Sequence, residues 1–112
     1  MENENENQSL EERYFNVYKK LQASLNEIGN LARKRMSLQE AIKRGEPSAK
    51  DAYLKVREDE RVADFKYWNC RRLLYNYEGE YEYVFKKKDA YIYFDRYIQS
   101  RLNIDSMKGG EK

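Results

Sequence analysis

The clearest pattern in the chain is a series of mostly apolar positions separated by alternating steps of four and three residues. The series runs through Leu10, Tyr14, Val17, Leu21, Ser24, Ile28, Leu31, Arg35, Leu38 and Ile42. These steps return to one face of an α-helix, so they predict a helix over residues 9–44 whose buried face has two polar members. Ser9, followed three residues later by Glu12, is a typical capping pair for its first turn.

A break at residues 45–48 contains a glycine, a proline and a serine, which are residue types that end, interrupt and cap helices. Beyond this turn, one column of residues recurs every seven positions. It consists of Val56, Ala63, Cys70, Tyr77, Val84, Tyr91 and Ile98. A repeat of seven is typical of helices packed as coiled coils, so it predicts a second helix over residues 49–104. Gly79 and residues 86–89 are its candidate breaks.

These patterns together predict an all-α fold. We expect a long antiparallel helical hairpin with coiled-coil-like packing, contained in a single helical domain over residues 9–104. Residues 1–8 alternate acidic and amide side chains with nothing to bury, and they are expected to form a flexible acidic tail. Residues 105–112, which include two consecutive glycines, are expected to form a flexible tail at the other end.

The position of the turn determines which residues face each other across the hairpin. A turn centred near residue 46 places Ile28 opposite Phe65. It also places Arg35 opposite Asp59 and Glu60, which predicts an ion pair that fixes the register. At about 1.5 Å per residue, the second helix is about 30 Å longer than the first. The segment beyond about residue 85 therefore has no expected partner on the first helix.

This C-terminal overhang has an apolar face that needs a cover. Its candidate seam consists of Val84, Tyr91, Phe94, Ile98 and Leu102. Two arrangements bury the seam: two copies of the chain pair through it, or the helix breaks at Gly79 and folds back as a third helix. Because the seven-residue column continues through Gly79, the pattern favours a homodimer, and it leaves the parallel or antiparallel orientation open.

The composition argues against most kinds of catalysis. The chain has 112 residues with 22 basic and 20 acidic side chains, no histidine and one cysteine. Without histidine there is no Ser-His or Cys-His nucleophile and no Glu-x-x-His di-iron motif, and one thiol is too few for a zinc site. We therefore predict a non-enzymatic protein with no catalytic residues, no metal, no cofactor and no small-molecule substrate.

Two residue groups could still carry chemistry. The carboxylates at residues 58–60 and at Glu78, Glu80 and Glu82 could bind Mg²⁺, but their spacing to basic residues is more typical of solvated helix pairs. Cys70 lies in the seven-residue column, which favours a small buried core residue over a reactive thiol. No apolar run approaches 18 residues and the N-terminus is acidic, so we expect a cytoplasmic protein that binds no membrane.

The overhang also carries a second stripe that combines tyrosines with basic residues. This tyrosine–basic stripe consists of Tyr75, Tyr83, Lys86, Lys87, Lys88, Tyr93, Arg96, Tyr97 and Arg101. Basic residues neutralise phosphates and tyrosine rings stack on bases, which is typical of DNA or RNA binding. Acidic residues interleave with these cations, however, and a helix that is apolar on two sides is typically buried on both. We therefore predict that the stripe binds a protein partner, as in an accessory or inhibitory protein of a virus or mobile element, and keep nucleic-acid binding as the alternative.

Overall fold

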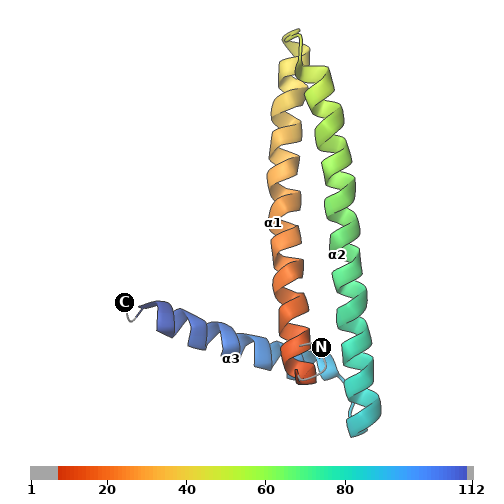
Figure 1. The fold of residues 1–112 in the computed structure, drawn as a ribbon, viewed down its shortest axis with the longest axis vertical. Helices are drawn as coiled ribbons and strands as arrows, with labels where there is room; N and C mark the ends of the chain where they lie inside the picture. The colour runs from red at the N-terminus through yellow and green to blue at the C-terminus, as the bar shows by residue number, and fades with distance from the viewer. Residues whose placement is uncertain (1–7, 111–112) are drawn as a thin grey trace, which may run out of the picture. The chain divides into compact units, whose positions relative to one another are not determined.

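The computed structural model describes residues 8–110, with side chains to residue 105, and it confirms an all-α fold (Figure 1). Its three helices are α1 (Leu10–Lys43), α2 (Ala49–Phe85) and α3 (Ala90–Gly110), and the described residues contain no strand. α3 continues to Gly110, beyond the predicted helix end at residue 104, so residues 105–110 of the predicted C-terminal tail are helical. The predicted N-terminal tail lies outside the described residues except for Gln8.

The ends of α1 follow directly from the sequence. The amide of Glu12 donates to the Ser9 hydroxyl at 3.1 Å, which caps the first turn. At the other end Gly45 adopts a φ of 78°, its amide donates to the carbonyl of Ile42, and the Glu46 amide donates to the carbonyl of Ala41. This pair of hydrogen bonds around a left-handed glycine is a Schellman motif, which ends the helix and opens the turn to α2.

The second interruption lies at residues 86–89 and not at Gly79, which is inside α2. Lys86 and Asp89 both adopt left-handed backbone conformations, with φ of 55° and 59°. A side chain of α2 also caps α3, because Glu82 Oε2 accepts a hydrogen bond from the Ala90 amide at 3.0 Å. The chain therefore reverses through a short turn that contains neither glycine nor proline.

The chain divides into two compact units. The hairpin unit, residues 19–71, contains the turn and the adjoining parts of α1 and α2, which run antiparallel (Figure 1). Small and medium side chains fill its core, and they are Leu21, Ser24, Ala41, Ala49, Val56, Ala63 and Cys70. The predicted ion pair is confirmed here, because Arg35 Nε lies 3.0 Å from Glu60 Oε1 in a partly buried position.

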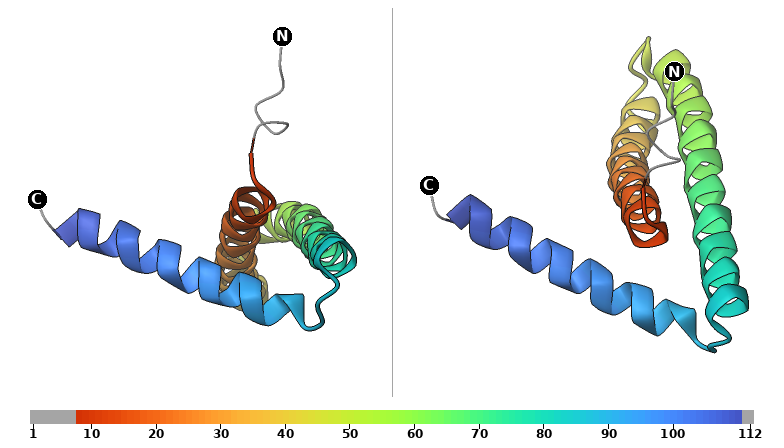
Figure 2. Two further views of the ribbon diagram at one scale, coloured as in Figure 1. Left: turned by 90° about the horizontal axis from the view of Figure 1, so that it is seen from below. Right: turned by 60° about the horizontal axis from the view of Figure 1, so that its bottom comes forward.

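The three-helix unit consists of residues 1–18 and 72–112. In it α3 crosses the N-terminal part of α1 (Figure 2). The Phe94 ring stacks on the Tyr14 ring of α1, with centroids 4.1 Å apart and planes 7° apart. Phe94 and Ile98 are 0% and 3% exposed. The prediction that residues beyond about 85 have no partner on the first helix is therefore wrong, because the turn at 86–89 brings α3 back to α1.

Within the single chain, the predicted seam is buried at Phe94 and Ile98 only. Val84 and Tyr91 are 57% and 58% exposed, and Leu102 is also exposed. A straight α-helix drifts by about 20° for every seven residues relative to an exact repeat of 3.5 per turn. The buried column of α2 consequently shifts after Cys70 by one step of four, to Leu74, and then to Tyr81.

Candidate interaction surfaces

The tyrosine–basic stripe belongs to the three-helix unit, and the turn at 86–89 distributes it over α2, the turn and α3. Its members fall into two groups. The first group is exposed and consists of Tyr75, Tyr83, Lys86, Lys87, Lys88 and Arg96. The second group consists of Tyr93, which is 39% exposed, and the half-buried Tyr97 and Arg101, and all three contact other side chains of the same unit. The stripe therefore does not lie on one continuous helix.

The second group holds α3 in place. The Tyr93 hydroxyl donates to Glu11 at 3.0 Å, and its ring stacks on that of Tyr81 at 4.5 Å. Burial, supported by the hydrogen bond to Glu11, raises the pKa of Tyr93 to about 12. The Arg101 guanidinium lies 4.6 Å from the Phe15 ring centroid, a cation–π contact between α3 and α1. Sequence analysis missed Phe15, which is 1% exposed, because it lies beside the predicted seam.

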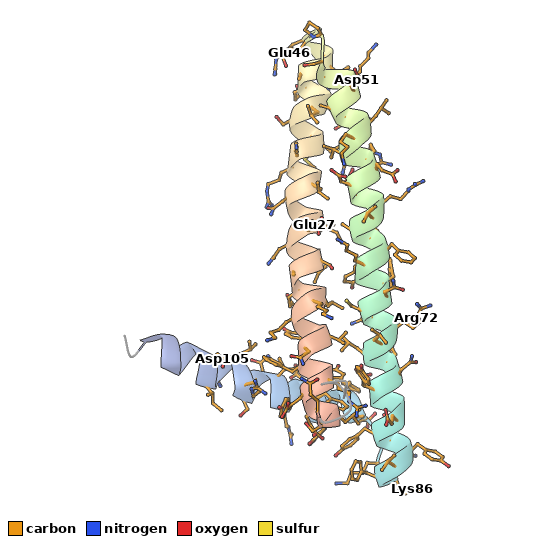
Figure 3. All side chains as sticks on the ribbon, viewed as in Figure 1. Glu27, Glu46, Asp51, Arg72, Lys86 and Asp105 are labelled. Atoms are coloured by element: carbon orange, nitrogen blue, oxygen red, sulfur yellow. The ribbon has the colours of Figure 1, made fainter. Side chains whose placement is uncertain are left out.

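The exposed group contains one concentrated basic feature, the basic turn formed by Lys86, Lys87 and Lys88. All three side chains are exposed, and Figure 3 shows Lys86 at the end of α2. The Lys86 ammonium lies 4.7 Å from the ring centroid of Tyr83, a residue that is 76% exposed. A cation and an aromatic ring are thus presented together to solvent.

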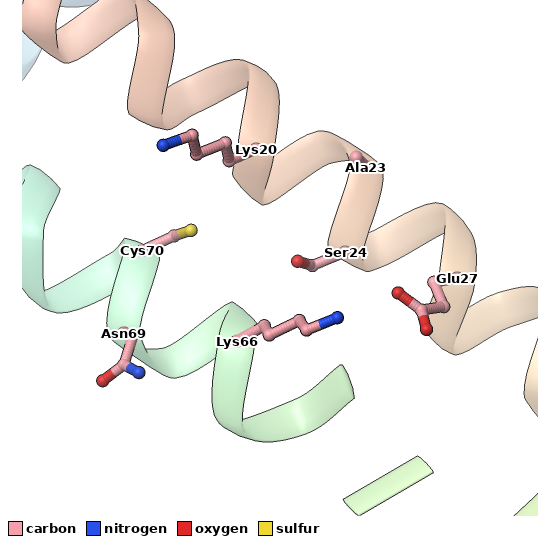
Figure 4. Close-up of a pocket in the computed structure, with 7 residues that line it drawn as sticks. All are labelled: Lys20, Ala23, Ser24, Glu27, Lys66, Asn69 and Cys70. Carbon is pink, nitrogen blue, oxygen red and sulfur yellow. The ribbon is translucent and has the colours of Figure 1, made fainter. Parts of the chain in front are cut away.

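A hollow of about 390 Å³ opens between the two helices of the hairpin unit (Figure 4). The residues that line it are Lys20, Ala23, Ser24, Glu27, Lys66, Asn69 and Cys70. Cys70 is a free thiol, and it is buried as expected for a small core residue. The hollow exists because small side chains meet here, and its mixed charges do not define a ligand of one chemical class.

The carboxylate cluster at residues 58–60 is paired with cations. Glu58 contacts Arg61 at 2.9 Å and Asp59 contacts Lys55 at 2.6 Å, a hydrogen bond that raises the pKa of Lys55. Glu60 contacts Arg35. In the described part of the chain, no three cysteine, aspartate or glutamate side chains lie close enough together to hold a metal ion.

The surface that sequence analysis missed lies on the outer face of α2, in the hairpin unit. Leu54, Phe65 and Trp68 are 65%, 69% and 65% exposed, and Val62 beside them is 45% exposed. The expected position of Phe65 opposite Ile28 is therefore wrong. Phe65 follows the buried Ala63 by two residues, which turns it about 200° around the helix and away from α1.

This outer stripe consists of Leu54, Glu58, Arg61, Phe65 and Trp68, with Val62 at its edge. Its members are separated by steps of four, three, four and three, so they share one helix face. The Trp68 ring stands edge-on to the half-buried Tyr67 ring, with centroids 5.2 Å apart. The same spacing rule that identified the core could have identified the stripe, which alternates between apolar and charged residues.

Comparisons of the chain with protein-family models, with curated protein sequences and with solved structures gave no match. None of the helices in the described residues is long and apolar enough to cross a membrane.

Proposed function

We propose that this chain is a non-enzymatic interaction protein that binds a protein partner through the outer stripe of α2. One observation carries the proposal: three large apolar side chains, Leu54, Phe65 and Trp68, are each about two-thirds exposed on the face opposite the core. Isolated exposed apolar residues are ordinary, but large apolar side chains gathered on one face of a small protein are typical of a binding surface.

The size of the patch supports binding. At about 200 Å² for each large side chain, Leu54, Phe65 and Trp68 expose about 400 Å² of mostly apolar surface. Full burial of that area stabilises a complex by about 10 kcal/mol before association costs of about 4–15 kcal/mol are subtracted. The contacts of flanking residues must add to this for a stable complex, and Glu58 and Arg61 are placed within the stripe to make them.

The test compares proteins bound by the full chain and by matched variants. Phe65→Glu introduces a charge at the centre of the stripe, and Met36→Glu introduces the same charge at a 57% exposed apolar position on α1. We expect Phe65→Glu to abolish binding of a partner, whether another protein or a second copy, and Met36→Glu to retain it. Circular dichroism should show that both variants remain helical. A bound protein retained equally by both variants contradicts the proposal.

The basic turn favours a second candidate, direct binding of DNA or RNA. Three exposed lysines with an exposed tyrosine, Tyr83, could contact phosphates and stack on an unpaired base. We test it by fluorescence anisotropy with single- and double-stranded nucleic acid at about 50 and 200 mM salt, between which phosphate-driven binding weakens steeply. Alanine replacement of residues 86–88 should remove the binding, whereas replacement of three other exposed lysines, Lys34, Lys43 and Lys50, should not. No binding at the lower salt excludes this candidate.

A further inference from the structure

We infer that the outer stripe pairs with the same stripe of a second copy of this chain, with the two α2 helices antiparallel. This inference rests on the proposed function and names the partner of the same surface. In that orientation, apolar residues of one stripe face apolar residues of the other, and acidic residues face basic ones. Leu54 meets the partner's Phe65, and Glu58 meets the partner's Arg61.

Charge complementarity carries the argument. In the antiparallel pair, the two-fold axis repeats each contact, so two Glu58–Arg61 contacts form between the copies at the centre of the interface. Each of these charges already contacts the other within its own chain at 2.9 Å. The pair therefore assembles a group of four alternating charges, flanked on both sides by a leucine against a phenylalanine.

A parallel pair and a shifted antiparallel pair both separate the charges of the stripe from opposite charges. A parallel pair brings Glu58 against the partner's Glu58 and Arg61 against the partner's Arg61, and like charges at facing positions repel. An antiparallel pair shifted by seven residues brings Glu58 against the partner's Trp68. It also brings Arg61 against the partner's Phe65, which separates both charges from their opposite-charge partners. The antiparallel register centred between residues 59 and 60 therefore places both charges of the stripe against opposite charges, with Trp68 at its edge.

The surface also has the shape that helix pairing requires. A shallow hollow of about 360 Å³ lies beside the stripe, and its lining includes Leu54, Arg57, Glu58 and Arg61. These residues are related as i, i+3, i+4 and i+7, the four positions that form the hole for a side chain of a facing helix. The antiparallel register brings the partner's Arg61 over this hole, next to Glu58, and the partner's Phe65 over Leu54 at its end.

The exposed area predicts how tight the pair is. Two stripes together contribute about 800 Å² of mostly apolar surface, and their charged flanks bring the total near the lower limit of about 1,200 Å² for specific interfaces. We therefore expect a reversible dimer with a dissociation constant in the micromolar range. Trp68, the only tryptophan in the chain, lies at the edge of this interface, so its fluorescence should shift to shorter wavelength as the concentration rises.

Charge exchange tests the pairing directly. Sedimentation equilibrium of the full chain between about 1 and 200 μM should show dimerisation, and Glu58→Arg and Arg61→Glu should each weaken it at least about tenfold. The double variant, Glu58→Arg with Arg61→Glu, should dimerise again, and a mixture of the two single variants should form a mixed dimer. Lys34→Glu changes the net charge as Arg61→Glu does, at an exposed site on α1, and should leave dimerisation unchanged.

Each other outcome overturns the inference. A chain that is monomeric at 200 μM but captures another protein through Phe65 refutes pairing with a second copy and leaves the proposed function intact. Dimerisation that survives both single reversals refutes the contact, and so does a double variant that fails to recover. A monomeric chain whose stripe variants also capture the same proteins as the unchanged chain refutes the inference and the proposed function together.

Discussion

Replacing Phe94 by alanine tests the most consequential feature of the fold, the return of α3 to α1. Phe94 is fully buried, stacked on Tyr14, with the rings of Tyr81 and Tyr93 edge-on to it at 5.4 and 5.3 Å. If α3 were held elsewhere, this residue would be an exposed aromatic on a free helix. Truncation there would cost almost nothing.

The expected cost is large for a chain of this size. Replacement of a buried phenylalanine by alanine typically costs about 3–5 kcal/mol, and favourable aromatic contacts place this site in the upper part of that range. The whole chain is expected to be stable by about 6–17 kcal/mol at ordinary values per residue. Phe94→Ala should therefore remove about 4 kcal/mol from the three-helix unit and release α3.

The assay is urea unfolding followed by far-UV circular dichroism, together with hydrogen exchange resolved along the chain. Phe85→Ala provides a matched control, because Phe85 is 54% exposed at the end of α2 and should cost less than about 1 kcal/mol. We expect Phe94→Ala to lower the unfolding midpoint and to lose exchange protection in α3 first. Equal effects of the two substitutions would refute the packing of α3 against α1.

Three further predictions concern turns, charges and pH. Gly45→Ala should destabilise the chain by about 1 kcal/mol because of its φ of 78°, whereas Gly79→Ala, in open space inside a helix, should stabilise it by about 0.5–1 kcal/mol; urea midpoints measure both. A double-mutant cycle of Arg35→Ala and Glu60→Ala should give a coupling of about 1 kcal/mol. Because the pKa of Tyr93 is raised to about 12, its stabilisation is complete below about pH 10 and lost as the pH rises towards 12. Because this side chain is 39% exposed, we expect the stabilisation to be about 1 kcal/mol. The urea midpoint of the unchanged chain should therefore fall between pH 10 and pH 12, and Tyr93→Phe should remove this dependence on pH.

The sequence predicts the hairpin unit well because local rules determine it. The steps of four and three in α1 identify the buried Leu21 and Ser24, and the glycine–proline turn sets the register. That register places Arg35 opposite Asp59 and Glu60, and the structure shows the ion pair with Glu60. Each of these features depends on residues that are close in sequence or on residues at equal distances before and after the turn.

The fold of the C-terminal segment is harder to predict for two physical reasons. The turn at 86–89 places Lys86 and Asp89 in left-handed conformations, although neither is a glycine, the residue type that usually marks such a position. It also depends on Glu82 of α2, which caps the first turn of α3. The sequence also keeps an exact repeat of seven, although the repeated positions of a straight helix gradually turn away from the neighbouring helix. Tyr77 and Val84 continue the repeat but are half-buried and exposed.

The outer stripe was missed because apolar residues were assigned to the core, and the sizes of the side chains show why that assignment fails. The inner column of α2 in the hairpin unit consists of Val56, Ala63 and Cys70, which bury little area but let the helices approach closely. Phe65 and Trp68, two large apolar residues of this segment, lie outside and contribute little to the stability of the single chain. A chain shaped by folding alone would place its largest apolar side chains inward, where each would stabilise it most. Their outward position is the basis of the proposed contact with another molecule, and the charges of Glu58 and Arg61 between Leu54 and Phe65 are the reason for proposing the antiparallel orientation of a second copy.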